Sequence, residues 1–193
     1  MVWVKNGTPD TLTSAGDAVT ISDLTAYKFN VFLSTHFETG GTINFNYTFN
    51  NNTNSVYADR ESINGASDTT NTSDTDIPYP QTTGDAIFFV NYVNSISGEE
   101  KLLIGWWCNS TSAGAGNPPS RVEKVGKFVP SPDADITRID ITNSQIGSYD
   151  TNTNLSALGS DLTEELNVQD GAIYYDTDLN KEYVLYNNTW TEI

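Results

Sequence analysis

Cysteine and histidine are almost absent from this chain of 193 residues, since each occurs once. With Cys108 as the single cysteine, an intrachain disulfide and a thiolate metal cluster are excluded. Cys108 ends an apolar run that includes Trp106 and Trp107, so we expect a small, buried side chain. The alternative is a nucleophilic cysteine, for which His36 is the one available imidazole base.

Basic residues are also few. Nine Lys and Arg stand against 25 Asp and Glu, which gives a formal charge of −16. Because phosphate backbones and anionic membranes repel so acidic a chain, we expect neither nucleic acid nor a membrane as a partner. No apolar run approaches the roughly 20 residues of a membrane-spanning helix. The N-terminus has none of the regions typical of a signal peptide.

The composition is poor in helix-favouring residues. Thr, Asn and Ser number 25, 21 and 17. Their side chains compete with the backbone for hydrogen bonds and favour strands and turns over helices. The 22 aromatic residues can fill a core, which argues against a disordered chain.

Period-two alternation is the dominant pattern. In residues 42–50 the apolar Ile43, Phe45, Tyr47 and Phe49 alternate with Asn and Thr. This pattern predicts a strand with one buried and one solvated face, as antiparallel sheets have. Residues 27–33 alternate less regularly, and the segment 38–41 (Glu-Thr-Gly-Gly) between the two predicts a hairpin turn.

The middle of the chain combines polar and apolar blocks. Residues 51–84 are rich in Asn, Ser, Thr, Asp and Gly and predict a surface excursion with one or two short strands. Residues 86–93 and 102–107 are apolar throughout, so we expect central strands that are buried on both faces. Further strands are expected at four places: 2–4, 18–21, 121–129 and 136–141.

Eight or nine short strands are thus expected before residue 145, separated by Gly, Pro and Asn turns. This predicts an all-β fold, an antiparallel, jelly-roll-like β-sandwich over residues 1–165. The spacing of Leu155, Leu158, Leu162 and Leu166 favours a short helix over 160–166, which we take as the domain boundary. Residues 166–193 then form a small C-terminal β-hairpin or meander.

The C-terminal turn contains the one metal-like motif. Asp176-x-Asp178-x-Asn180 has the opening spacing of a calcium loop, but Lys181 and Asn187 occupy positions where such loops have Gly and Glu. We therefore expect an Asx-rich hairpin turn and no metal or cofactor. A weak structural calcium site is the alternative.

The arginines are the other candidates for binding. Arg60, Arg121 and Arg138 are expected to pair with carboxylates such as Asp59, Glu61 or Glu123, with ligand binding as the alternative. Arg121, Lys124 and Lys127 form the one basic cluster, which is too small for a nucleic-acid footprint.

Catalytic motifs do not appear in the sequence. It contains no nucleophile elbow, phosphate-binding loop or zinc-ligand spacing. With 25 acidic residues, some pair of carboxylates suits glycoside hydrolysis by chance, so the spacing of the acids is not diagnostic. We expect a protein that is not an enzyme, and no catalytic residue is assigned.

Residues 171–190 resemble a segment that recurs in bacteriophage tail-fibre and virion proteins. The segment has the pattern G-x-x-x-Y-D-T-x-x-N-x-x-Y…W, which here runs from Gly171 to Trp190. Residues 57–60, 99–102, 111–116 and 125–127 are similar to stretches of virion structural proteins of environmental, notably marine, viruses. Together the likeness covers most of the chain from about residue 25.

The resemblance implies a non-enzymatic virion component that is assembled in the host cytoplasm. It would be a capsid decoration, head-fibre or tail-associated subunit, with other capsid or tail proteins as partners and a homo-oligomer, by analogy a trimer, as its working form. A receptor- or glycan-binding, lectin-like module on the virion surface is the alternative, since aromatic residues and Asn/Asp loops suit sugars. An envelope-degrading enzyme is a third possibility. The resemblance transfers no ligand-binding residue.

Overall fold

The computed structural model describes residues 3–83, 86–110, 114–130, 134–161, 171–177, 179–187 and 189–193. The chain divides into two compact units, Val2–Asp161 and Leu162–Ile193, which are described separately. In the described residues every regular element is a β-strand and every strand pairing is antiparallel. The prediction of an all-β, antiparallel fold is therefore confirmed. No helix in this part of the chain is long and apolar enough to cross a membrane.

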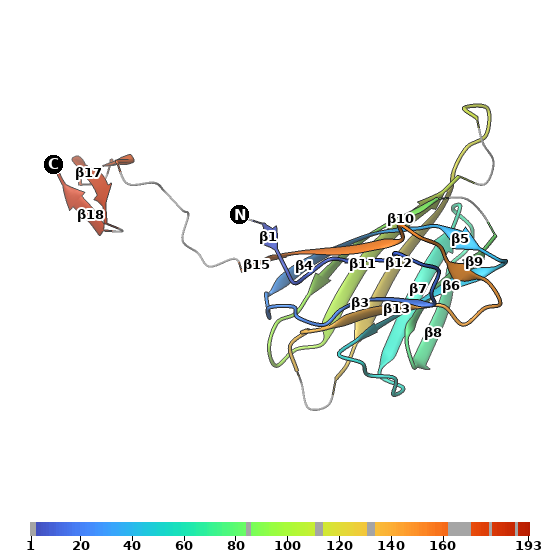
Figure 1. Cartoon of the computed structure of the whole chain (residues 1–193). Coiled ribbons are helices and arrows are strands. Elements are labelled where there is room, and N and C mark those ends of the chain that lie inside the picture. The colour runs from blue at the N-terminus through green and yellow to red at the C-terminus, as the bar shows by residue number, and fades with distance from the viewer. Residues whose placement is uncertain are drawn as a thin grey trace. The chain divides into compact units, whose positions relative to one another are not determined.

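The first unit contains a nine-stranded sheet (Figure 1). Its strand order is β1-β15-β4-β10-β11-β12-β7-β8, and β2 also pairs with β15. The strands are β1 (Val4–Lys5), β2 (Asp10–Thr11), β4 (Phe29–His36), β7 (Tyr57–Ile63), β8 (Thr69–Asp74), β10 (Ile87–Asn94), β11 (Lys101–Asn109), β12 (Ser120–Phe128) and β15 (Asn154–Ser160).

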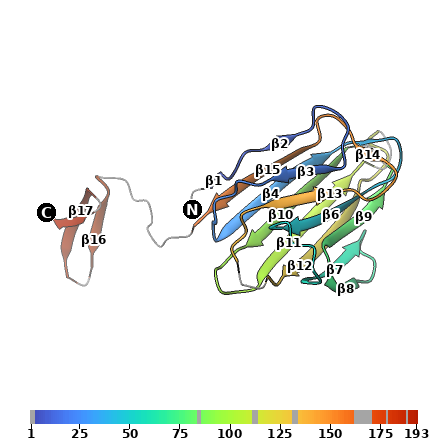
Figure 2. The same ribbon diagram turned by 60° about the horizontal axis from the view of Figure 1, so that its bottom comes forward.

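A smaller sheet lies across one face of the nine-stranded sheet (Figures 1 and 2). It has four strands in the order β3-β13-β6-β9, namely β3 (Ala18–Ile21), β13 (Ile139–Thr142), β6 (Ile43–Phe49) and β9 (Ile77–Thr82). A separate pair of short strands joins β5 (Glu38–Thr39) to β14 (Ser148–Tyr149).

One apolar core is shared by the two sheets, as in a β-sandwich. Phe89 of the large sheet lies at its centre, with its ring centroid 4.8 Å from that of Phe45 and 5.1 Å from that of Tyr79, both in the small sheet. Aromatic rings packed edge to face at these distances add to the free energy gained from burial. The jelly-roll-like topology stays a prediction.

The alternation in residues 42–50 corresponds to β6. Ile43, Phe45, Tyr47 and Phe49 are all buried, as the pattern predicts. The predicted hairpin over 38–41 is wrong, because β4 and β6 belong to different sheets and do not pair. Glu38 and Thr39 form β5 instead, and β5 pairs with β14. The turn-like glycines therefore lie where the chain crosses from one sheet to the other.

The segment 51–84 is more than a surface excursion. It supplies β7 and β8 to the large sheet and β9 to the small one. Tyr57, Ile77 and Tyr79 from this segment are buried in the shared core. In the described residues thirteen strands, β1 to β13, precede residue 145, more than the eight or nine expected, because several are only two to four residues long.

The second unit contains a three-stranded antiparallel sheet of β16 (Ile173–Asp176), β17 (Lys181–Tyr186) and β18 (Thr189–Glu192). Tyr174 packs against Tyr183 and Trp190, with ring centroids 6.0 and 5.9 Å apart. The predicted boundary after residue 165 lies outside the described residues.

The helix predicted over 160–166 lies outside the described residues beyond Asp161. Its periodic pattern began in a strand, because Leu155 and Leu158 belong to β15. Leu155 is buried in the core and Leu158 lies on the opposite face of the sheet, as residues three apart on a strand do. The spacing of these two leucines is therefore not helical.

Candidate interaction surface

The two apolar blocks form neighbouring central strands of the large sheet, but they are not buried on both faces. In β10 and β11 buried and exposed residues alternate. Phe89, Leu103 and Trp107 face the shared core, whereas Tyr92 and Ile104 are about half exposed on the other side of the sheet. The prediction of two buried faces is wrong, because the small sheet covers only one face of these strands.

We call the uncovered side of the nine-stranded sheet the outer face. The strand register aligns its side chains in rows across the sheet. One row contains Val31, Tyr92, Ile104 and Val125 from β4, β10, β11 and β12. The neighbouring row contains Leu33, Val90, Trp106 and Glu123. The rings of Tyr92 and Trp106 meet edge to face, 6.0 Å apart.

A continuous apolar patch occupies the centre of the outer face. Six of its side chains are between 45% and 52% exposed: Phe88, Tyr92, Leu102, Ile104, Trp106 and Val125. If each offers about 100 Å², the six together expose about 600 Å², which is at the upper limit for a monomeric protein. An interface of standard size buries about 800 Å² per partner. The patch is therefore of the size that a stable protein–protein contact requires.

The apolar patch carries little net charge. No charged side chain faces outward from β4, β10 or β11. At the β12 and β7 side, each positive side chain forms an ion pair with a negative one, so the charges cancel within each pair. The pairs are Arg121–Glu123 at 3.2 Å, Lys127–Glu100 at 3.1 Å and Arg60–Asp68 at 3.1 Å. The outer face is therefore close to neutral there, although the chain as a whole carries a formal charge of −16.

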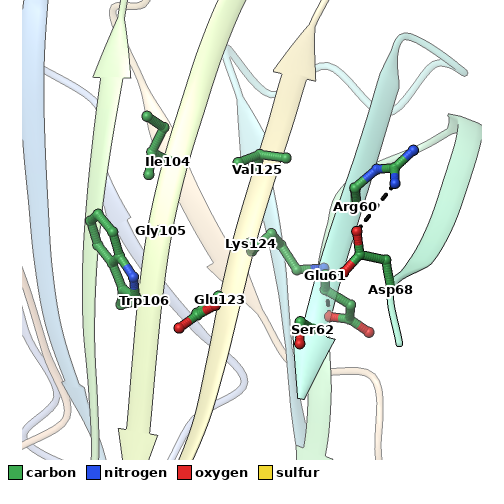
Figure 3. Close-up of a pocket in the computed structure, with 10 residues that line it drawn as sticks. All are labelled: Arg60, Glu61, Ser62, Asp68, Ile104, Gly105, Trp106, Glu123, Lys124 and Val125. Atoms are coloured by element: carbon green, nitrogen blue, oxygen red, sulfur yellow. Dashed lines mark hydrogen bonds and ion pairs between the residues drawn. The ribbon is translucent and has the colours of Figure 1, made fainter. Parts of the chain in front are cut away.

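A shallow depression of about 250 Å³ lies beside the patch (Figure 3). Ile104 and Trp106 line it from β11, Val125 and Glu123 from β12, and Arg60 from β7. An indole next to charged hydrogen-bonding groups is an arrangement that suits a sugar ring.

The three arginines pair with carboxylates, as expected. Arg121 pairs with Glu123, one of the expected partners, whereas Arg60 pairs with Asp68 and Arg138 with Asp140. The three hydrogen bonds between Arg138 and Asp140, at 2.5 to 3.0 Å, raise the pKa of the guanidinium.

The expected basic cluster does not exist as a surface feature. Arg121 and Lys127 lie on the outer face, but Lys124 is buried on the core side. Residues three apart on a strand point to opposite faces, and this separates Lys124 from the other two. Lys124 pairs with Asp59 and Glu61, two carboxylates that were expected to pair with arginines.

Cys108 and His36 lie on opposite faces of the large sheet. Cys108 is exposed on the outer face, so the prediction that it is buried is wrong. His36 is fully buried among the rings of Phe45, Phe89 and Tyr149. Burial lowers the pKa of His36 to about 3, because the core does not solvate the imidazolium. The two residues therefore do not form a nucleophile–base pair.

The calcium-like motif coincides with the turn between β16 and β17. Asp178 lies outside the described residues. The backbone N–H of Leu179 donates to Asp176 Oδ1 at 3.0 Å, and Asn180 has a φ of 55°, as in an Asx-rich hairpin turn. Among the described residues, no group of three His, Cys, Asp or Glu side chains is placed to hold a metal ion.

A buried charged cluster was missed by the sequence analysis. Asp59, Glu61 and Lys124 lie together on the core side of β7 and β12, beneath the depression of Figure 3. The signal was present, since Asp59 and Glu61 occupy alternate positions of a strand and so share a face with buried Tyr57. Locating Lys124 beside them required the pairing of β7 with β12, whose residues are about 65 positions apart.

Comparison of the chain with protein-family models, with curated proteins and with solved structures gives no match in any of the three.

Proposed function

We propose that this protein is a non-enzymatic structural subunit of a virus particle, a capsid decoration, head-fibre or tail-associated protein that acts through assembly. The virion assignment rests on the sequence resemblance. The observation that carries the assembly role is the apolar patch of the outer face, which the chain's own strands leave uncovered. We propose that other copies of the same chain cover it.

Three features of the patch support copies of this chain as the occupant. Its area is close to what each partner of a stable dimer buries. The charged side chains at its edge form ion pairs with one another, which reduces the electrostatic repulsion between two acidic chains. Flat apolar sheet faces also pack on one another about 10 Å apart, as they do within sandwiches.

The test is the molar mass of the full chain in solution, measured by light scattering over a range of concentrations. We expect an oligomer for the wild type and a monomer for Ile104→Lys, which places an ammonium at the centre of the patch. A hot-spot residue contributes about 2 kcal/mol or more, so association should weaken about 30-fold or more. The trimer implied by the resemblance stays a prediction, and the same measurement of molar mass tests it.

Ser14→Lys is the matched control. Ser14 is exposed in the turn between β2 and β3, so the substitution adds the same charge away from the patch. It should leave the molar mass unchanged. A wild-type chain that stays monomeric at high concentration and does not bind purified particles would refute the proposal.

The second candidate is a receptor- or glycan-binding module, which the depression beside Trp106 favours. Here Trp106→Ala should abolish binding on a glycan array even in the background of Leu102→Lys, a patch variant outside the depression. Glycan-array silence for the wild type and for both variants would count against this function and would leave the assembly role untouched.

A further inference from the structure

The buried charged cluster consists of one amine and two carboxylates in van der Waals reach of each other. Lys124 Nζ lies 2.8 Å from Asp59 Oδ1 and 2.9 Å from Glu61 Oε2. The side chains of Lys124 and Asp59 are 0% exposed, and that of Glu61 is 15% exposed. Figure 3 shows Lys124 extending from β12 towards Glu61 on β7.

The surroundings of this cluster hold the amine against Asp59. Lys124 Nζ donates to the backbone carbonyl of Pro78 and lies 4.9 Å from the centroid of the Tyr79 ring. Asn71 Nδ2 donates to both carboxylate oxygens of Asp59, at 3.4 and 3.2 Å. The register places Lys124 opposite Glu61 and Gly126 opposite Asp59, so neighbouring strands fix the positions of both reacting groups.

Burial makes an ion pair between these side chains costly. Removing two charges from water costs several kcal/mol per ion, and attraction within the pair only partly offsets this cost. Condensation of the amine with a carboxyl group gives an amide and water, and the amide carries no charge to desolvate. An amine held against a carboxyl group, away from bulk water, is the arrangement that amide formation requires.

We propose that Lys124 and Asp59 condense to an intramolecular isopeptide bond and that Glu61 is the proton relay. The Nζ lone pair attacks Asp59 Cγ and forms the N–C bond. Glu61 takes a proton from Nζ and returns it to the departing hydroxyl as the C–O bond breaks. One amine and one carboxylic acid thus give one amide and one water, with no oxidant, reductant or other reactant.

Glu61 is suited to the relay by its position. Its Oε2 is buried and makes no hydrogen bond within the described part of the chain, although it lies 2.9 Å from Lys124 Nζ. An acceptor that is close to the amine but not engaged elsewhere can take the proton that the reaction releases. Holding amine, acid and relay on two paired strands replaces a bimolecular encounter by a fixed geometry.

An exposed pair of the same chemistry provides the contrast. Lys127 Nζ lies 3.1 Å from Glu100 Oε2, but these side chains are 43% and 51% exposed. Water solvates both charges there, so no condensation is expected. Proximity is common to both pairs, and burial distinguishes them.

The cross-link would tie β7 to β12 covalently in a chain whose single cysteine forms no intrachain disulfide. This inference is independent of the proposed function, because it rests on the core side of the sheet and not on the apolar patch.

The test is the intact mass of the purified, denatured full chain, followed by tandem mass spectrometry of its peptides. We expect the wild type to be lighter than its sequence mass by one water and to give one joined peptide pair that contains Asp59 and Lys124. Asp59→Asn should lose ammonia in place of water and so reach the same final mass as the wild type. Lys127→Arg, the matched control, should retain the loss of water.

Glu61→Gln should stay at its full sequence mass, because the amide cannot take up the proton. If Glu61→Gln is cross-linked as completely as the wild type, the relay role is refuted. A wild-type chain at its full sequence mass refutes the isopeptide bond itself, and so does a water loss that maps to the Asp170-Gly171 dipeptide, where a succinimide forms. Circular dichroism, recorded before denaturation, checks that each variant is folded.

Discussion

The buried histidine makes folding stability dependent on pH between neutral and mildly acidic conditions. His36 is the one histidine of the sequence and is enclosed by three aromatic rings in the sandwich core. Desolvation lowers its pKa from 6.5 to about 3. The perturbation is therefore a decrease in pH from neutral to mildly acidic.

The sign and size follow from proton linkage. Below pH 6.5 the unfolded chain binds a proton at His36 that the folded chain does not bind, so the free energy of unfolding falls as the pH falls. The contribution is fully present above pH 6.5 and is lost progressively down to about pH 3. At about 1.4 kcal/mol per pH unit, the loss reaches about 2 kcal/mol by about pH 5.

The assay is urea unfolding of the wild type and of His36→Phe at a series of pH values between about 7.5 and 5. Phe keeps an aromatic ring in the core but has no group to protonate, so its stability should change less with pH. The raised pKa of half-buried Asp76 acts with the opposite sign, and because it is present in both proteins it cancels from their difference. Equal pH dependence in the two proteins would refute the reasoning.

Three further outcomes are expected. Tyr57→Phe should lower the free energy of unfolding by about 1–2 kcal/mol in denaturant titrations, because the hydroxyl accepts from the backbone N–H of Phe49 and donates to the backbone carbonyl of Asn52. Gly105→Ala should destabilise by about 2 kcal/mol or more, since the added Cβ would fall 2.1 Å from Asn91 Oδ1, whereas Gly116→Ala, with open space around it, should not. Cys108 should react rapidly with a maleimide in the Ile104→Lys variant and slowly in the wild-type oligomer; equal rates would contradict coverage of the outer face.

Strands were well predicted from the sequence where one face was apolar and the other polar. β6 satisfies this condition over its whole length, and its four apolar residues are all buried. The partner of a strand was harder to predict. Gly40 and Gly41 both have positive φ, which a hairpin turn would also require, so local sequence does not distinguish a return within one sheet from a crossing to the other.

The exposed face of β10 and β11 could not be predicted from the sequence for a different reason. β10 and β11 are apolar at nearly every position, and such a pattern is typical of strands covered on both sides. The pattern does not tell whether the second face of these strands is covered by the same chain or by another molecule. Ile104 and Trp106 were therefore expected inside, and the structure shows them about half exposed, because the small sheet spans only one side.

The edge of the large sheet limits how copies can join. β8, at one end of the strand order, has the sequence Thr-Thr-Asn-Thr-Ser-Asp, and Ser73 within it has a φ of 55°, which interrupts an extended ladder. Short, polar and irregular edge strands resist the addition of a further strand from another molecule. With lateral growth blocked at this edge, the proposed association through the apolar patch would pair face with face, which favours a closed oligomer over a growing fibre.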